Sequence, residues 1–470
     1  EGRAGDDEAG EGEEEVAAME TKHLGPWAAL SIVAGTMLGI GIFIAPPVVA
    51  GHVQSPVWFL MLWLAGGLAA LCGALCMAEL GAMMPRAGGE YPYLRAAYGP
   101  GIAFATGWLQ LLAIFPGSLA AMAVGTATFQ LPTLFGPAFA APIDLLGMLT
   151  IEGPTFWSVV IVLLLTLLNH VGIVLSGRVQ LVLTVVPLAV LLLVSLYVVG
   201  DMGAGQVTGE AARAGLAQRP GAQALAQAYL PIYFAYSGWN AAIYIGGEVA
   251  EPGKNLPRAV VGGTLTVLVL YLVLCMGFLS VFDTKTLAGV GEAGTAAAST
   301  LFGQAGVTVV TLMILLAMLG SINGSIMTGS RVAYAMAQKG HCLPVAGRLH
   351  PRFGTPVAAL WLQSALALAL IFSRRFDQLM EYASAAMLVA GSLAVATVVV
   401  LRRKLPQQPR PYRLRLYPWA PVVYIASSLF VLVALGLKGD VSVWMALGWF
   451  VLALGFHAVV IGPRAGAQDG

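Results

Sequence analysis

Three glycines fall within seven residues of the first long apolar stretch, which reads Gly35-Thr-Met-Leu-Gly-Ile-Gly-Ile-Phe43. Each glycine weakens a helix by roughly 1 kcal/mol relative to alanine, so this spacing predicts a break in a membrane helix. Backbone amides and carbonyls freed at membrane depth persist only where protein buries them or a watery cavity hydrates them. The break therefore indicates a binding site, although small residues also serve close packing of membrane helices.

A second apolar stretch is interrupted by Pro231 and by Ser237-Gly238. The two interrupted stretches are five apart in the order of apolar segments. Corresponding interruptions in two halves of a chain indicate an inverted-repeat transporter that binds its substrate near the membrane midplane. Amides at the N-terminus of a half-helix suit a carboxylate, and carbonyls at a C-terminus suit an ammonium group, so this chemistry favours an amino acid.

The composition is that of a polytopic membrane protein. Of the 470 residues, 58% are hydrophobic and 10% are charged, against about 25% charged in soluble domains. Runs of about 20 apolar residues, enough to cross a hydrocarbon core, recur along the chain. We expect twelve membrane segments, at 26–50, 56–83, 101–130, 154–171, 179–200, 223–250, 258–282, 306–337, 355–373, 377–401, 418–437 and 442–462.

The basic residues predict the orientation. With a cytoplasmic N-terminus and alternating segments, 18 of the 24 Lys and Arg residues fall inside, as the positive-inside rule requires. Both termini are then cytoplasmic, in a cell membrane. Residues 1–24 are rich in acids, glycine and alanine, a disordered composition that lacks the basic start of a signal peptide.

Other classes of protein are disfavoured by what the chain lacks. The six His residues lie near segment ends rather than together, so no enzyme site, metal site or cofactor is expected. The net charge of +1 gives no sign of a nucleic-acid partner, which leaves the substrate and membrane lipid as partners. Four cysteines fall in membrane segments or on the cytoplasmic side, where disulfides are unlikely.

Acids within the apolar runs are costly unless they are paired or hydrated. Glu79 and Glu248 fall toward the cytoplasmic ends of their segments, where hydrogen bonds with arginine or backbone at a gate are expected, and Glu381 starts a later segment. No acid stands beside either break in the sequence, which favours neutral amino acids as substrates. A cationic amino acid or polyamine exchanger remains the alternative, as does a channel, receptor or non-transporting amino-acid sensor on the same scaffold.

Six ordered motifs resemble those of the amino acid–polyamine–organocation superfamily, and within it the L-type amino-acid transporter branch. The resemblance spans roughly residues 26–418 and implies the all-α, leucine-transporter-type fold: a 5+5 inverted repeat with broken helices 1 and 6, plus two further helices. It divides the chain into 25–200 (first repeat), 201–402 (second repeat), 403–463 (helices 11 and 12) and a cytoplasmic tail at 464–470. The motifs are Gly35–Phe43, Gly73–Leu80, Gly88–Tyr93, Phe234–Asn240, Glu248–Arg258, and Gly320–Ser325 followed by Ser330-Arg331.

The resemblance also implies roles at both breaks. The loosened backbone at Gly39, Ile40 and Gly41 would receive the substrate carboxylate. Phe234 matches the aromatic gate that closes over the substrate from outside. Carbonyls that would receive the ammonium group lie near Thr36, Met37, Phe234 and Ser237.

Gly238 and Asn240 complete the expected binding residues: Asn240 would hold the broken helix or touch the substrate, and Trp239 between them would have a gating or structural role. Two positions depart from the family. Ile40 stands where the branch usually has Ser or Ala, and Ala241 stands where human members carry an aromatic residue. Substrate identity therefore does not transfer from the relatives.

Eukaryotic members of the branch bond a heavy chain through a cysteine after segment 3, but residues 131–153 contain none, so no disulfide-linked partner is expected. Many members also carry a coupling lysine nine residues after an Arg-Val-Gln motif. Here Arg178-Val-Gln is followed at that distance by Pro187, which excludes proton coupling through that amine. The remaining possibilities for coupling are a sodium ion at Ser321 and Ser325, another proton carrier, or no ion. We expect sodium-independent exchange or facilitated diffusion.

Overall fold

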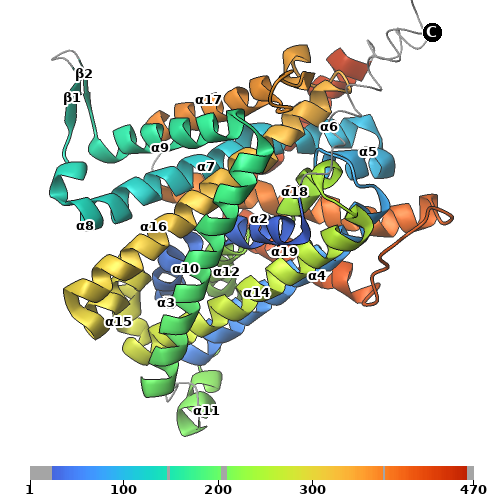
Figure 1. The fold of residues 1–470 in the computed structure, drawn as a ribbon. Helices are drawn as coiled ribbons and strands as arrows, with labels where there is room; N and C mark the ends of the chain where they lie inside the picture. Colours follow the sequence, from blue (N-terminus) through green and yellow to red (C-terminus); the bar gives the residue numbers. More distant parts are fainter. Residues whose placement is uncertain (1–23, 146–148, 203–208, 374–375, 463–470) are drawn as a thin grey trace, which may run out of the picture.

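The computed structural model describes residues 24–145, 149–202, 209–373 and 376–462, which are almost entirely helical (Figure 1). The acidic tail, apart from Leu24, and the tail at 464–470 lie outside the described residues. Within the described residues, ten helices are long and apolar enough to cross a membrane, and α17 (Val357–Ser373) is a shorter apolar helix. The chain is therefore a multi-pass membrane protein.

The helices follow the order of the apolar segments. Two π-helical turns, at Gln110–Ile114 and Thr126–Gln130, join α6, α7 and α8 into one long span. The other bounds are α4 (Pro56–Met83), α5 (Tyr91–Tyr98), α6 (Pro100–Leu109), α7 (Phe115–Gly125), α8 (Leu131–Phe135), α9 (Gly153–His170), α10 (Ile173–Met202), α11 (Gly209–Ala217), α14 (Pro252–Val281), α15 (Thr284–Ala288), α16 (Ala293–Ala337), α18 (Phe376–Lys404), α19 (Trp419–Gly436) and α20 (Val441–Phe456).

Both expected interruptions are present. Three residues separate α2 (Pro26–Met37) from α3 (Gly41–His52). Five residues separate α12 (Ala222–Ala235) from α13 (Ala241–Tyr244). Each interruption frees backbone groups inside the helical body, where protein rather than lipid must satisfy them.

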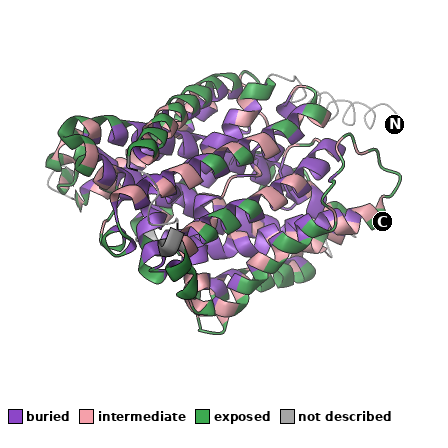
Figure 2. Ribbon diagram, turned by 90° about the horizontal axis from the view of Figure 1, so that it is seen from below, coloured by how far each residue is buried: buried purple, intermediate pink, exposed green. Residues whose placement is uncertain are grey.

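The interrupted helices occupy the interior. In the most apolar window of each span, 83% of Pro26–His52 is buried, against 11% of Val441–Ile461. Figure 2 shows the buried residues concentrated along the inner helices and the exposed ones on the periphery. The helix α2 packs against α10, α14 and α16, and α3 packs against α12, so the breaks are enclosed by protein.

Several boundaries differ from the sequence prediction: α14 begins at Pro252 rather than at residue 258, and α16 begins at Ala293 rather than at residue 306. The fifth segment was likewise expected to begin at residue 179, but α10 already begins at Ile173. The turn is made earlier, by Gly172 with a φ of 137°. This backbone conformation is accessible to glycine and strained for other residues, which explains where α9 ends.

A short hairpin adds strands to a fold that was expected to be all helical. Strand β1 (Ile143–Leu145) pairs antiparallel with β2 (Leu149–Ile151), with Ile143 opposite Ile151. It lies in the connection between α8 and α9 and projects from the helical body (Figure 1). The outer edges of this two-stranded hairpin carry unpaired backbone groups that need hydrogen bonds to water. The hairpin therefore suits a loop outside the hydrocarbon region.

Candidate binding site at the two helix breaks

One cavity lies between the two interruptions. It measures about 80 Å³ as the space open to the centres of water molecules, which is room for several waters or a small ligand. Trp239, Ser321 and Ser325 line it together with all nine residues that the sequence assigned to substrate binding. Those nine are Thr36, Met37, Gly39, Ile40, Gly41, Phe234, Ser237, Gly238 and Asn240.

The first break presents free amides. The amides of Phe43 and Ile44 both donate to the carbonyl of Ile40, at 3.0 and 3.1 Å. Among the described residues, no backbone carbonyl accepts from the amides of Gly41 or Ile42. These unpaired donors, at the positive end of the 12-residue helix α3, can bind an anion such as a carboxylate.

The carbonyls at the end of α2 are partly occupied. The Met37 carbonyl accepts from the Gly39 amide at 2.8 Å and from the Tyr271 hydroxyl at 2.6 Å, which uses both of its lone pairs. The Thr36 carbonyl accepts from the Ser321 hydroxyl at 2.7 Å and keeps one lone pair. Of the two, only the Thr36 carbonyl remains open to a further donor.

The second break touches the first. Gly238 has a φ of 94°, and a Cβ added there would lie 2.8 Å from Thr36 Cγ2 and 3.1 Å from the Thr36 carbonyl carbon. Only glycine fits both this conformation and this approach. The Phe234 carbonyl accepts from the Ser237 amide at 3.0 Å, whereas the described residues offer no donor to the Ser237 carbonyl. The Ser237 carbonyl is therefore available to a ligand.

Trp239 and Asn240 anchor the second break to its surroundings. The Trp239 ring meets Tyr424 edge-on at 5.5 Å between centroids, and a Cβ at Gly73 would lie 2.8 Å from it. The Asn240 amide donates to Glu90 Oε1 at 2.6 Å. The aromatic contact fixes the position of the turn, and the amide contact connects the turn to an acid.

Glu90 corrects the expectation that no acid stands beside either break. Its side chain lines the cavity, is buried, and accepts from Asn240 and from Gln110 Nε2, the latter at 2.7 Å. Burial raises the pKa of Glu90 to about 7. The hydrogen bonds from Asn240 and Gln110 act in the opposite direction, because they stabilise the charged carboxylate, but their effect is smaller. Glu90 lies 150 residues before Asn240, so sequence distance concealed the contact. The signal was an acid within the Gly88–Tyr93 motif.

Glu79 and Glu248 do not line the cavity and pair with arginine. Glu79 accepts from Arg402 Nε at 2.9 Å and from Arg410 Nε at 3.2 Å, and Glu79 Oε2 accepts from the Leu414 amide at 2.7 Å. Glu248 accepts from Arg331 Nε at 3.1 Å. These contacts join α4 to α18 and the segment after it, and the segment after α13 to α16. A gating role for these acids stays a prediction.

Ser321 and Ser325, the candidate ion ligands, both line the cavity, and an ion site there stays a prediction. Ser321 donates to the Thr36 carbonyl and would lie 2.9 Å from a Cβ at Gly39, so it fills the space beside the first break. The Ser325 side chain lines the cavity one turn further along α16. Within the described residues, no three His, Cys, Asp or Glu side chains gather to hold a metal ion.

Sequence reasoning did not identify a buried polar chain beside α2. Asn169 donates to Asn323, and Asn323 donates to Gln180 Oε1, each at 2.8 Å. Gln180 donates to Thr184, which donates in turn to the Ser31 carbonyl at 3.2 Å. A Cβ at Gly35 would lie 2.0 Å from Thr184 Oγ1, so a glycine at this position leaves room for the row of hydrogen-bonded polar side chains.

Comparison with known proteins identifies the class. The amino acid permease family profile matches residues 24–460, so the chain belongs to this family of membrane transporters. It is 31% identical to the serine/threonine exchanger SteT of Bacillus subtilis over 418 residues, which cover 87% of this chain and 90% of that protein. The large neutral amino acids transporter small subunit 2 of Homo sapiens is 28% identical over 414 residues, 88% of this chain and 75% of that protein.

A third relative is the cystine/glutamate transporter of Homo sapiens, 28% identical over 411 residues, 87% of this chain and 79% of that protein. The family and these relatives place the chain beside the L-type branch of the amino acid–polyamine–organocation superfamily. They are transporters rather than enzymes. The resemblance inferred from the six motifs is therefore confirmed.

Proposed function

We propose that this protein carries amino acids across a membrane by alternating access. The observation that supports the proposal is the cavity lined by both helix breaks, far apart in sequence, where free amides and open carbonyls lie together. The names of three relatives all refer to amino acids as substrates. A zwitterion is the ligand whose two charges match a helix N-terminus and a pair of carbonyls.

In the proposed complex, the carboxylate binds the amides of Gly41 and Ile42 at the start of α3. The ammonium group binds the open carbonyls of Thr36 and Ser237, which replaces the earlier expectation that included Met37. Phe234 closes the cavity over the substrate, and Trp239 holds the turn behind it.

The architecture that goes with this mechanism has twelve membrane helices. The ten long spans, α17 and the interrupted helix of α12 and α13 together make that number. We propose that the first ten form the inverted 5+5 repeat, with both termini in the cytoplasm. The excess of basic residues on one set of loops supports this orientation.

Neutral amino acids are the first candidate substrates. The two oxygens of Glu90 already accept amide hydrogens, and a pKa of about 7 leaves this carboxyl only partly charged near neutral pH. A cationic side chain would be better served by a fixed negative charge. Cationic amino acids are the second candidate, because Glu90 is an acid on the cavity wall without a cation partner among the described residues.

Flux in proteoliposomes tests the proposal. The panel is labelled L-serine, L-leucine, L-lysine, L-glutamate and putrescine, with and without unlabelled amino acid inside, and protein-free liposomes are the control. We expect saturable uptake of L-serine or L-leucine that internal amino acid accelerates. Faster uptake of L-lysine or putrescine would favour the second candidate. Binding without flux of any compound would instead identify a sensor.

A further inference from the structure

Glu90 lies where three parts of the fold meet. It directly precedes α5, and its carboxyl is held between Asn240, in the turn before α13, and Gln110, in the π-helical turn after α6. The two hydrogen bonds measure 2.6 and 2.7 Å, and the side chain is 2% exposed. The group therefore connects the second helix break to the span of α6 and α7, which also lines the cavity.

No cation neutralises this acid within the described part of the chain. None of the ion pairs found there, at N–O distances up to 4.0 Å, involves Glu90, and Arg331 of α16 is already paired with Glu248. The titratable groups that interact with the carboxyl are phenols: Tyr93 from its own segment, Tyr233 and Tyr244 from α12 and α13, and Tyr424 from α19.

Among the described residues, the remaining elements around the cavity present no charge to Glu90. From α16 the cavity receives Ser321, Ser325 and Thr328, and from α18 it receives Met387 and Ala390. The carboxyl is thus surrounded by amides, hydroxyls and apolar groups. In such a setting the neutral, protonated form competes with the ionised form.

The neighbouring amide can serve either form. Gln110 Nε2 donates to Glu90 and to the Tyr244 hydroxyl, while Gln110 Oε1 is buried without a hydrogen-bond partner among the described residues. A half-turn of this amide would bring Oε1 to the carboxyl, where it would accept the O–H of a protonated Glu90. Asn240 would continue to donate to the other oxygen, so both protonation states keep two hydrogen bonds.

We propose that Glu90 is the proton-binding site of this transporter, taking up a proton when the cavity closes and releasing it when the cavity opens to water. This rests on the proposed function as an amino-acid transporter. The proposal adds a proton as a second ligand of the transporter. The side chain that carries this proton would be Glu90, not a lysine at position 187, where this chain has proline.

The direction of coupling follows from burial. In the buried arrangement the pKa of Glu90 rises from its ordinary 4.5 to about 7. In a state where water reaches the carboxyl, the pKa returns toward the ordinary value. Between these values the closed state binds more protons than the open state, so falling pH favours closure. By reciprocity, a substrate that closes the cavity also promotes proton uptake.

Uptake of labelled L-serine and L-leucine into proteoliposomes at internal pH 7.5 tests the proposal. Wild-type uptake should rise several-fold as external pH falls from 7.5 to 5.5. Glu90→Gln resembles the protonated form and should transport at the acid rate throughout, without a pH response. His341→Gln is the matched control: burial lowers the pKa of this neighbour of Tyr91 to about 4, so the residue is neutral throughout and the response should persist.

A second measurement needs no variant. Adding L-serine or L-leucine to purified wild-type protein in unbuffered solution at pH 6 should remove about one proton per bound substrate from solution, and none at pH 9. The proposal is overturned if substrate binds without proton uptake, or if Glu90→Gln keeps the wild-type pH response. Absence of binding and flux for every amino acid at every pH would instead refute the proposed function.

Discussion

At the residue scale, the glycines of the first motif have different physical roles. Gly35 admits Thr184 and Gln180 of α10 against α2, and Gly41 admits α12, where an added Cβ would lie 2.5 Å from Ala235 Cα. At Gly39 an added Cβ would meet the Ser321 hydroxyl at 2.9 Å and Met122 Sδ at 3.7 Å. A side chain can move aside, but the backbone of a packed helix cannot do so cheaply.

Substitutions at Gly39 and Gly41 should therefore separate binding from stability. Gly41→Ala should lower the melting temperature, with a cost of roughly 1–3 kcal/mol from overpacking. Gly39→Ala should fold as a monodisperse protein but lose about tenfold or more in affinity for L-serine or L-leucine, because a methyl group enters the substrate site beside the α3 amides. Thermal unfolding and equilibrium binding measure the two effects.

The double variant Gly39→Ala with Ser321→Ala is the control, since it removes the hydroxyl that the new methyl group meets. If affinity returns in the double variant, contact with Ser321 caused the loss and the backbone site is not supported. Equal affinity of the wild type for an amino acid and its carboxamide would also contradict carboxylate binding at these amides.

At the element scale, α10 has Pro187 where the family resemblance leads us to expect a coupling lysine, and its polar side chains serve packing. Pro187 is buried inside this helix, while Gln180 and Thr184 join the polar chain that runs from Asn169 to the Ser31 carbonyl. On the facing helix α16, the hydroxyl hydrogen of Ser321 is donated to the Thr36 carbonyl. Among the described residues that line the cavity Glu90 is the single acid, and it contacts the second break, so no carboxylate balances a sodium ion at Ser321.

Transport should therefore proceed without sodium. Uptake of labelled L-serine with choline replacing sodium at fixed pH should stay close to the rate in sodium. Ser321→Ala should likewise show equal uptake in sodium and in choline. A loss of about tenfold or more in choline, equivalent to about 1.4 kcal/mol of coupling, would contradict the prediction and indicate a sodium site beside Ser321.

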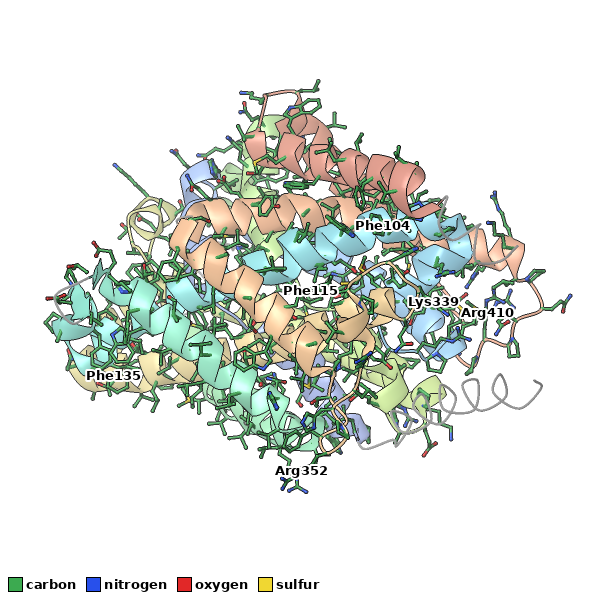
Figure 3. The ribbon with its side chains drawn as sticks, turned by 90° about the horizontal axis from the view of Figure 1, so that it is seen from above. Phe104, Phe115, Phe135, Lys339, Arg352 and Arg410 are labelled. Carbon is green, nitrogen blue, oxygen red and sulfur yellow. The ribbon has the colours of Figure 1, made fainter. Side chains whose placement is uncertain are left out.

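At the scale of the whole molecule, buried ion pairs tie distant segments together. Arg402 and Arg410, in and after α18, meet at Glu79 of α4, and Arg331 of α16 meets Glu248. Figure 3 shows Arg410 and Lys339 on one side of the molecule and Phe135 on the other, with Phe115 of the cavity wall between them. The ionic contacts thus lie apart from the cavity.

The single chain should also be sufficient for transport. Its four cysteines are unpaired and buried or half-buried: Cys72 and Cys76 on α4, Cys275 on α14, and Cys342 after α16. Replacing all four with serine should preserve flux of L-serine and L-leucine in proteoliposomes, and the wild type should migrate identically on reducing and non-reducing gels. A copurifying subunit that flux requires would refute this prediction.

The sequence alone determined the elements and the two breaks. Hydrophobic runs are long and local, so the membrane segments were predictable, although α10, α14 and α16 begin earlier than expected. Gly35–Phe43 and Ser237-Gly238 disrupt helices through local backbone preferences. The turn at Gly172 and the β1–β2 hairpin were missed because a few residues in a loop carry weak periodic signal.

Only the tertiary structure decided which groups at the breaks are free. The Met37 carbonyl is occupied by Tyr271, 234 residues away, and Glu90 reaches the second break through Asn240, 150 residues away. Such contacts depend on how helices pack, and no local pattern encodes them. Burial then sets the charge of the site. The sequence places the Glu90 carboxyl in a polar loop, but the fold encloses it and raises its pKa to about 7.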